Sequence, residues 1–164
     1  MRSFAFAILL VVLLAVPQTF AGTSQVTAGK FFEIIRKFER THHPKKTQIE
    51  AMTGRNLHQQ AYWQYVSDEN QADVVPKLET TLSREGQTTS VLLYVNPDLH
   101  ISPDDVRTEF GDAPKKSDHS DIKSISFEYE YEHKWGWTTF MFEMVGNRAR
   151  LRYAETGYRH NGKS

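Results

Sequence analysis

The chain has 164 residues, in which 20 lysine and arginine residues balance 20 aspartate and glutamate residues, and it has no cysteine. A formal net charge of zero, with both signs scattered along the chain, argues against nucleic acid as a main partner, because phosphate binding needs a concentrated positive surface. The lack of cysteine excludes disulfides, thiolate metal sites, a cysteine nucleophile and a lipid-modified cysteine.

Residues 1–21 have the layout of a secretory signal peptide. Arg2 is followed by an apolar run over residues 4–16, and the small residues Thr19 and Ala21 occupy the −3 and −1 positions of a cleavage site. The run is too short to cross a bilayer comfortably, and no later apolar stretch approaches the required length. We therefore expect export to the periplasm or the outside of the cell, with cleavage near Ala21, and a soluble mature chain with no stable membrane anchor.

Residues 22–164 predict a single α+β domain that begins with helices. The small, polar residues 22–27 are expected to form a loose leader. Residues 30–40 predict an amphipathic helix, because apolar residues recur at the spacing i, i+3, i+4 and i+7: Phe31, Ile34, Ile35 and Phe38. A second, shorter helix is predicted from a capping box at residues 47–50 and from Gly54 as its C-terminal cap.

Strands are predicted in the middle of the chain. Residues 62–66 are rich in aromatic residues, which favour a pleated surface. Residues 76–86 fit either a helix or a strand, and we favour a β-hairpin with its turn at Glu85–Gly86. That turn would pair Leu82 with Thr89, Thr80 with Val91 and Leu78 with Leu93.

A third helix is predicted after residue 101. Ser102 fits its N-cap and Pro103 its first position, and Gly111 marks its end. The residues that follow, 112–121, are polar and are predicted to form a loop.

The last third of the chain predicts a three-stranded antiparallel meander. Apolar and polar residues alternate over residues 125–132, 139–144 and 148–153, with turns at residues 134–137 and at Gly146–Asn147. On the buried face the second turn would pair Met144 with Ala149, Phe142 with Leu151 and Phe140 with Tyr153, and on the other face it would pair Glu143 with Arg150. That other face would carry acids on one outer strand and arginines on the other.

The order of predicted elements occurs twice, over residues 45–97 and 101–156, as tandem helix-plus-sheet repeats. Residues 101–114 (ISPDDVRTEFGDAP), followed by the charged and aromatic meander, resemble the helix-and-sheet unit of the SmpA/OmlA-type outer-membrane assembly lipoproteins and the β-lactamase inhibitor protein (BLIP-like) family. The resemblance implies N-terminal helices packed on antiparallel sheet and a concave protein-binding surface. This chain lacks the lipoproteins' anchoring cysteine and the inhibitor's disulfides, so neither the anchor nor the inhibitor's target carries over.

Several groups carry residue types suited to catalysis or metal binding. Glu128, Glu130 and Glu132 alternate along one predicted strand, so neighbouring pairs are about 6.5–7 Å apart, a separation that some glycoside hydrolases use. We favour a solvated face whose acids are balanced by the arginines at 148, 150 and 152. His42 and His43 are adjacent, so their side chains diverge. A loop at residues 118–121 could bring Asp118, His119 and Asp121 together on a metal ion, but nothing fixes a fourth ligand, so no metal site is predicted. No nucleophile elbow or phosphate-binding glycine loop occurs, and no catalytic residue or cofactor is predicted, although an acid–base pair in a pocket needs no linear motif.

We therefore expect an exported, non-enzymatic protein that binds a protein partner through a face of its antiparallel sheet. Aromatic residues at a turn and charges that segregate by sign are typical of such contacts. The predicted partner-binding residues are Glu128, Glu130, Trp135, Trp137, Arg150 and Arg152. The alternative hypothesis is an NTF2-like protein whose aromatic-lined pocket binds or converts a small molecule, which the long apolar N-terminal helix also suits.

Overall fold

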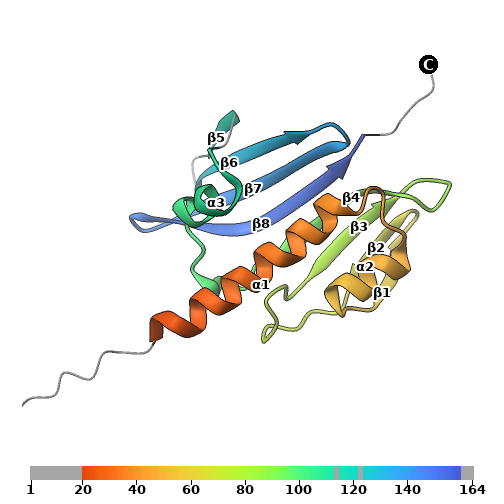
Figure 1. The fold of residues 1–164 in the computed structure, drawn as a ribbon, viewed down its shortest axis with the longest axis horizontal. Coiled ribbons are helices and arrows are strands. Elements are labelled where there is room, and N and C mark those ends of the chain that lie inside the picture. The colour runs from red at the N-terminus through yellow and green to blue at the C-terminus, as the bar shows by residue number, and fades with distance from the viewer. Residues whose placement is uncertain (1–19, 113–114, 122–123, 160–164) are drawn as a thin grey trace, which may run out of the picture.

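The computed structural model describes residues 20–112, 115–121 and 124–159. These residues form three α-helices, a short 3-10 helix and a single eight-stranded antiparallel sheet, so the chain has the predicted α+β fold (Figure 1). Apart from Phe20 and Ala21, the predicted signal peptide lies outside the described residues. Across the described part of the chain, no helix combines the length and the apolar character needed to cross a membrane.

The strands form two consecutive meanders that share one sheet. The helices are α1 (Phe20–Arg40), α2 (Lys46–Thr53), η1 (Pro97–Leu99) and α3 (Pro103–Phe110). The strands are β1 (Leu57–Ala61), β2 (Gln64–Ser67), β3 (Leu78–Leu82), β4 (Thr88–Tyr94), β5 (Lys115–Asp121), β6 (Ser124–His133), β7 (Gly136–Val145) and β8 (Arg148–Tyr158). Their order in the sheet is β1-β2-β3-β4-β8-β7-β6-β5, so the last strands of the two meanders meet. Helix α2 precedes the first meander and α3 precedes the second.

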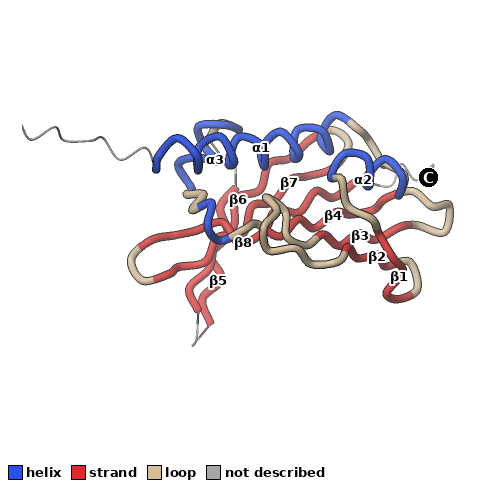
Figure 2. Tube along the Cα trace, turned by 90° about the horizontal axis from the view of Figure 1, so that it is seen from below, coloured by secondary structure: helices blue, strands red, loops and turns tan. Residues whose placement is uncertain are grey.

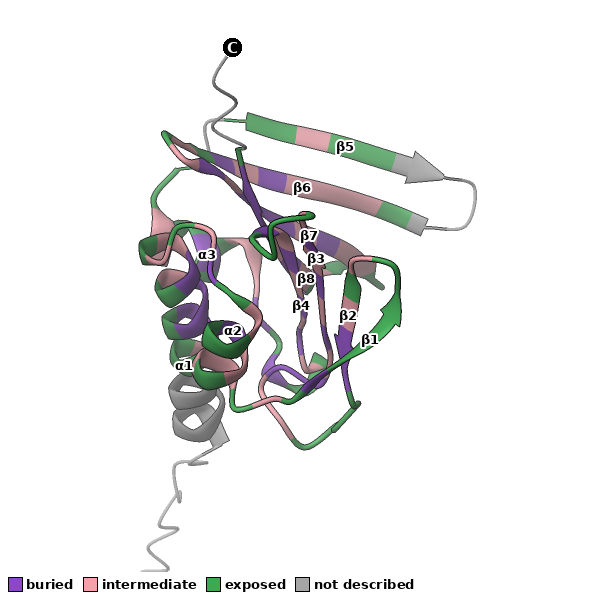
Figure 3. Ribbon diagram, turned by 90° about the vertical axis from the view of Figure 1, so that its right-hand side faces the viewer, coloured by how far each residue is buried: buried purple, intermediate pink, exposed green. Residues whose placement is uncertain are grey.

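All three α-helices pack on the same face of the sheet (Figures 2 and 3). The predicted apolar stripe of α1 provides the contact, because Phe31, Ile35 and Phe38 have no exposed surface. The sheet contributes fully buried residues to the same core, among them Leu78, Val91, Phe140 and Phe142. The two edges of the sheet bend away from the helix layer, toward the side that no described helix covers (Figures 2 and 3).

The N-terminal helices largely match their predicted positions. Helix α1 includes residues 30–40, as predicted, but residues 22–27 continue the helix instead of forming a loose leader. No proline interrupts them, and extending an existing helix needs no new nucleation. Helix α2 ends at Gly54, whose left-handed conformation (φ 68°) makes it the predicted cap. The cap at its start lies earlier than predicted, since the Gln48 side chain accepts a hydrogen bond from the backbone N–H of Lys45 at 2.8 Å.

The first aromatic segment forms a hairpin rather than one strand. Residues 57–61 form β1, which was not predicted because its polar residues are mostly exposed and do not alternate. Tyr62 and Trp63 form the turn, with Trp63 at a φ of 67°, and β2 begins only at Gln64. Aromatic composition predicted a strand here but did not locate the turn within it.

The hairpin predicted after Pro76 is confirmed, with a local shift in register. Leu78 pairs with Leu93 and Thr80 with Val91, as expected from the alternation of apolar residues. Leu82 pairs with Thr88 instead of Thr89, because an irregularity follows Thr81. The connection is longer than the predicted two residues, since the N–H of Ser83 donates to the carbonyl of Gln87 at 2.7 Å.

The meander of β6, β7 and β8 is confirmed, and β8 contains a bulge. Met144 pairs with Ala149, Phe142 with Leu151 and Glu143 with Arg150, as predicted. Beyond the irregularity between Met141 and Phe142, Phe140 pairs with Ala154 instead of Tyr153. The bulge leaves Arg152 as an extra residue in β8 and keeps Phe140, which has no exposed surface, in the core.

Residues 115–121, expected within a polar loop, form the edge strand β5. The strand pairs along its length with β6, from Lys115 opposite Glu130 to Asp121 opposite Ser124. Its described side chains are largely exposed, so no alternation of apolar and polar residues marks it in the sequence. Charged residues on an edge strand also hinder pairing with a second sheet.

Candidate functional site

The face of the sheet opposite the helices carries most of the predicted partner-binding residues, and we call it the open face. Because side chains alternate along each strand, the pairing of the strands places one set of residues there. This set comprises Glu79, Leu92, Tyr94, Glu128, Glu130, Trp137, Thr139, Met141, Tyr153 and Glu155, with Glu143, Arg150 and the bulged Arg152 at one end. Most of them are half-buried although no described helix covers them (Figure 3). The bending of the two sheet edges and the side chains around them produce this partial burial.

Acidic residues dominate the centre of the open face. Glu155 lies between Leu92 of β4 and Thr139 of β7 in the pairing of the strands. Burial raises the pKa of the Glu155 carboxyl, the Ser90 hydroxyl opposes that rise through a hydrogen bond, and the charge of Glu128 adds to it. In the described residues, Glu155 takes part in no ion pair. A cation placed beside Glu155 would therefore gain a partner that the chain itself does not neutralise.

The other two acids of this region are paired with the edge strand. The Lys115 ammonium lies 3.1 Å from the Glu130 carboxylate, and His119 Nε2 lies 3.5 Å from Glu128. Both partners come from β5, which the sequence predicted as a loop. The acidic strand β6 is thus partly balanced by its edge neighbour β5. Among the described residues no ion pair joins it to the arginines on β8, which the sequence predicted as its balance.

Two tyrosines connect the acidic centre to the far end of the face. Burial, followed by the charges of Glu155 and Glu128, raises the pKa of Tyr153. Burial and the neighbouring Glu79 raise the pKa of Tyr94, whose hydroxyl donates to Glu79 at 3.3 Å. Both phenols therefore stay protonated and can donate hydrogen bonds at neutral pH.

The arginines of β8 mark the basic end of the open face. Arg152 donates to the Glu143 carboxylate at 2.7 Å. Arg150 pairs with Glu143 in the register of the strands, but among the described residues it takes part in no ion pair. The acids of β6 and the arginines of β8 thus lie on separate strands, as predicted, although β8 also carries Glu155, and among the described residues Arg148 shares with Arg150 the lack of an ion pair.

The two predicted tryptophans lie on opposite faces. Trp137 lies on the open face and pairs across the strands with Gly157. A Cβ on Gly157 would meet the indole, at 2.6 Å from Cη2 and closer still to Cζ2 and Cε2. The lack of a side chain at Gly157 thus leaves room for the indole to lie directly on the backbone of β8. The other side of the ring is open, and Trp137 is half-buried.

Trp135 lies in the turn before β7 and packs toward the helices. Its ring stacks on His133, with centroids 4.6 Å apart and planes 8° apart, and it also contacts Tyr158 and His42. Five of the six predicted partner-binding residues therefore share the open face, and Trp135 does not. The reason is that His133 pairs directly with Gly136, so the turn holds only two residues and sets the direction of both tryptophans.

A half-buried acid–imidazole pair beneath Trp135 was not predicted. Glu39 of α1 lies 3.4 Å from His133 Nε2 and accepts a hydrogen bond from the Thr138 hydroxyl at 3.2 Å. Burial raises the pKa of Glu39, and His133 opposes that rise. No sequence pattern joins these residues, which come from α1, β6 and β7. Because Trp135 covers the imidazole, the pair ties the end of α1 to the sheet.

Metal binding finds no support at the positions considered from the sequence. Asp118 and His119 are neighbours on β5, so their side chains point to opposite faces. His43 Nδ1 lies 3.0 Å from the carbonyl of Thr88. Within residues 20–112, 115–121 and 124–159, no group of three or more histidine, aspartate or glutamate residues is arranged to hold a metal ion.

No family model and no curated protein matches this chain. Among solved structures, a DUF4309 family protein (YjgB) from Bacillus subtilis subsp. subtilis str. 168 is similar, with a TM-score of 0.46 and 9% sequence identity. The match covers 70% of this chain and 78% of that chain.

Proposed function

We propose that this protein is an exported, non-enzymatic binding protein that holds a protein partner on the open face of its sheet. The observation that carries the proposal is a half-buried aromatic and apolar surface, interleaved with charges, on a sheet face that no described helix covers. Tryptophan, tyrosine, methionine and arginine, all represented here, are enriched in the cores of protein interfaces. A concave binding surface is also what the resemblance to the BLIP-like family implies.

The partner's chemistry follows from the centre of the face. Glu155 has a raised pKa and no ion pair in the described residues, and Leu92 and Met141 lie near it as half-buried apolar neighbours. A lysine or arginine from the partner would neutralise Glu155, and an apolar flank would cover Leu92 and Met141. Desolvated pairs of this kind fix register and exclude partners of the wrong charge.

Packing between the helices and the sheet favours this proposal over the NTF2-like alternative. That alternative needs a cavity between the two layers, lined by aromatic residues. In the described structure, Phe31, Phe38, Phe140 and Phe142 lie there with no exposed surface. The aromatic residues fill the core instead of lining a space.

Site-specific photo-crosslinking in cells tests the proposed face. A photoreactive residue at Leu92 or Met141 should capture a defined partner, while the same residue at Thr108, exposed on α3, should not. With the captured partner purified, Glu155→Gln should weaken binding about tenfold, the loss expected for one charged contact, and Glu85→Gln in the exposed β3–β4 turn should not. Equal capture from all three positions, or no effect of Glu155→Gln, would contradict the proposal.

Export is tested separately by the N-terminus of the mature protein. We expect the chain recovered from the envelope or medium to begin at Gly22, by intact mass. Recovery of the protein in the cytoplasm with Met1 retained would contradict export, without bearing on the open face.

A further inference from the structure

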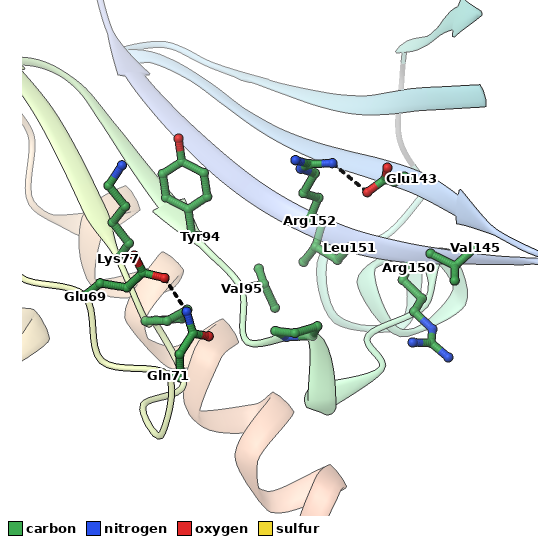
Figure 4. Close-up of a pocket in the computed structure, with 12 residues that line it drawn as sticks. Glu69, Gln71, Lys77, Tyr94, Val95, Glu143, Val145, Arg150, Leu151 and Arg152 are labelled. Atoms are coloured by element: carbon green, nitrogen blue, oxygen red, sulfur yellow. Dashed lines mark hydrogen bonds and ion pairs between the residues drawn. The ribbon is translucent and has the colours of Figure 1, made fainter. Parts of the chain in front are cut away.

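A pocket of about 400 Å³ lies at the basic end of the open face, where Tyr94, Arg150 and Arg152 line both the face and the pocket. It forms because the pairing of β4 with β8 ends at Tyr94 and Tyr153, where the chain turns away into η1 while β8 continues (Figure 4). Backbone groups along its walls already have hydrogen-bond partners. The N–H of Val95 donates to the carbonyl of Arg152 at 3.0 Å, and the N–H of Leu151 donates to the carbonyl of Ile101 at 2.9 Å. Contacts to a ligand would therefore come from side chains.

The inner surface of this pocket is largely apolar. Five of the side chains that line it carry no polar group: Pro76, Val95, Pro97, Val145 and Leu151. Val145, at the tip of the β7–β8 hairpin, is 49% exposed and is one of the few large exposed hydrophobic residues of the described chain. Tyr94 forms part of the wall beside them. Apolar lining with a few polar groups, at a volume of several hundred Å³, is typical of small-molecule sites.

The charged side chains of the pocket leave one cation available. Lys77 lies 2.6 Å from Glu79, and Arg152 lies 2.7 Å from Glu143, so both have carboxylate partners. Arg150 has no ion pair among the described residues, and it projects from the β8 wall (Figure 4). An anionic group on the ligand would therefore bind at Arg150.

The same charges select a carboxylate over a phosphate. A guanidinium pairs with a carboxylate through two parallel hydrogen bonds. A doubly charged phosphate would need a second free cation and would lie near the acids Glu69 and Glu143, which also line the pocket. We propose that this pocket binds a small monocarboxylate with an apolar body, whose carboxylate contacts Arg150 and whose body covers Val95, Leu151 and Val145.

Titration of the full mature chain by methyl and amide NMR tests this site. The probes are hexanoate and 4-phenylbutyrate, each compared with its uncharged amide. The acids should shift the methyl resonances of Val95, Val145 and Leu151, and each amide should bind at least tenfold more weakly. Arg150→Gln should weaken the acids to the level of their amides and leave the amides unchanged. Arg84→Gln is the matched control. It changes the charge equally, but Arg84 follows the end of β3 and the pocket lies at the start of that strand, beside Lys77.

Each outcome of the titration either supports or refutes the proposed site. Saturable shifts at these methyl groups, lost on Arg150→Gln and kept on Arg84→Gln, support the pocket. No shifts there with either acid, equal binding of acid and amide, or equal effects of the two arginine variants would overturn it. Failure of this site can be told apart from failure of the protein-binding proposal, because Leu92 and Glu155, which test the partner, do not line this pocket.

Discussion

Replacing Gly157 by alanine should displace the Trp137 indole from the open face. The new Cβ would lie 2.6 Å from Cη2 of Trp137 and closer to two further atoms of the indole, because the ring lies against the backbone of Gly157. Carbon atoms in favourable contact are about 3.5–4.0 Å apart, so the ring must lift by at least about 1 Å. The strand itself is held by its pairing with β4 and β7, so the indole is the part that moves.

The expected free energies come from two opposing effects. Forcing an extra carbon against a packed ring costs about 1–3 kcal/mol, and replacing glycine by alanine within a strand returns about 0.5–1 kcal/mol. Gly157→Ala should therefore lower the free energy of unfolding by about 1 kcal/mol. In a Trp137→Ala background the clash is gone, and the same change should raise the free energy of unfolding by about 0.5–1 kcal/mol.

Denaturant unfolding of the four proteins, followed by circular dichroism, gives the coupling between the two positions. We expect about 1–3 kcal/mol. Gly136→Ala serves as the control, because its Cβ would overlap the carbonyl oxygen of Gly157, a backbone contact that Trp137→Ala cannot relieve. If Gly157→Ala has the same effect in both backgrounds, the indole does not lie on Gly157 and the account of this part of the open face is wrong.

Three further predictions concern stability. Gly29→Ala should raise the free energy of unfolding by about 0.5–1 kcal/mol, because this glycine lies in α1 with open space around its Cα. An unchanged urea midpoint would show that this turn of α1 is not formed. Ser102→Ala should lower the free energy of unfolding by about 1 kcal/mol, since the Ser102 hydroxyl accepts from the N–H of Asp105 at 3.2 Å. Ser102→Asp should retain most of the stability if capping is the cause. Burial raises the pKa of Glu155, so the folded chain binds its proton more readily than the unfolded chain, and this group's contribution to stability falls as the pH rises from 4.5 through the raised pKa. Glu155→Gln should therefore have the higher urea midpoint at pH 7 and lose that advantage toward pH 4, and a constant difference would contradict the assigned pKa direction.

Elements with one buried and one solvated face were predictable from the sequence. The spacing of Phe31, Ile34, Ile35 and Phe38 located α1, and the alternation in β3, β4, β7 and β8 fixed most of the register. A slip of one residue would have moved apolar side chains into water, so the pattern permits few registers.

Elements without such a face were missed. Strand β5 has mostly exposed described side chains, and β1 exposes four of its five residues, so neither shows a period in the sequence. The bulge in β8 makes Ala154, instead of the predicted Tyr153, the cross-strand partner of Phe140. It depends on backbone geometry, which the pattern of side chains does not show.

The candidate site was predictable only in part, for the same reason. Parity along the strands placed Glu128, Glu130 and Arg150 on one face, as the structure has them. Whether Trp135 lies on the open face or toward the helices depended on the length of the turn between β6 and β7, which the sequence did not determine. The Arg150 pocket and the Glu39–His133 pair join segments that are distant in the chain, and no local pattern connects them.

The seam between β4 and β8 governs how the chain reaches its fold. Every other pairing among the described strands joins neighbours in the sequence and can form as a local hairpin, whereas Ser90 meets Gly157 across nearly the whole second meander. Such distant contacts form late and slow folding, because a long loop must close before they contribute. Tyr158, at the end of β8, also donates to the carbonyl of Phe38 in α1 at 3.2 Å. A chain shortened before β8 would therefore be left with two unjoined meanders, in which β4 and β7 each have an unpaired edge.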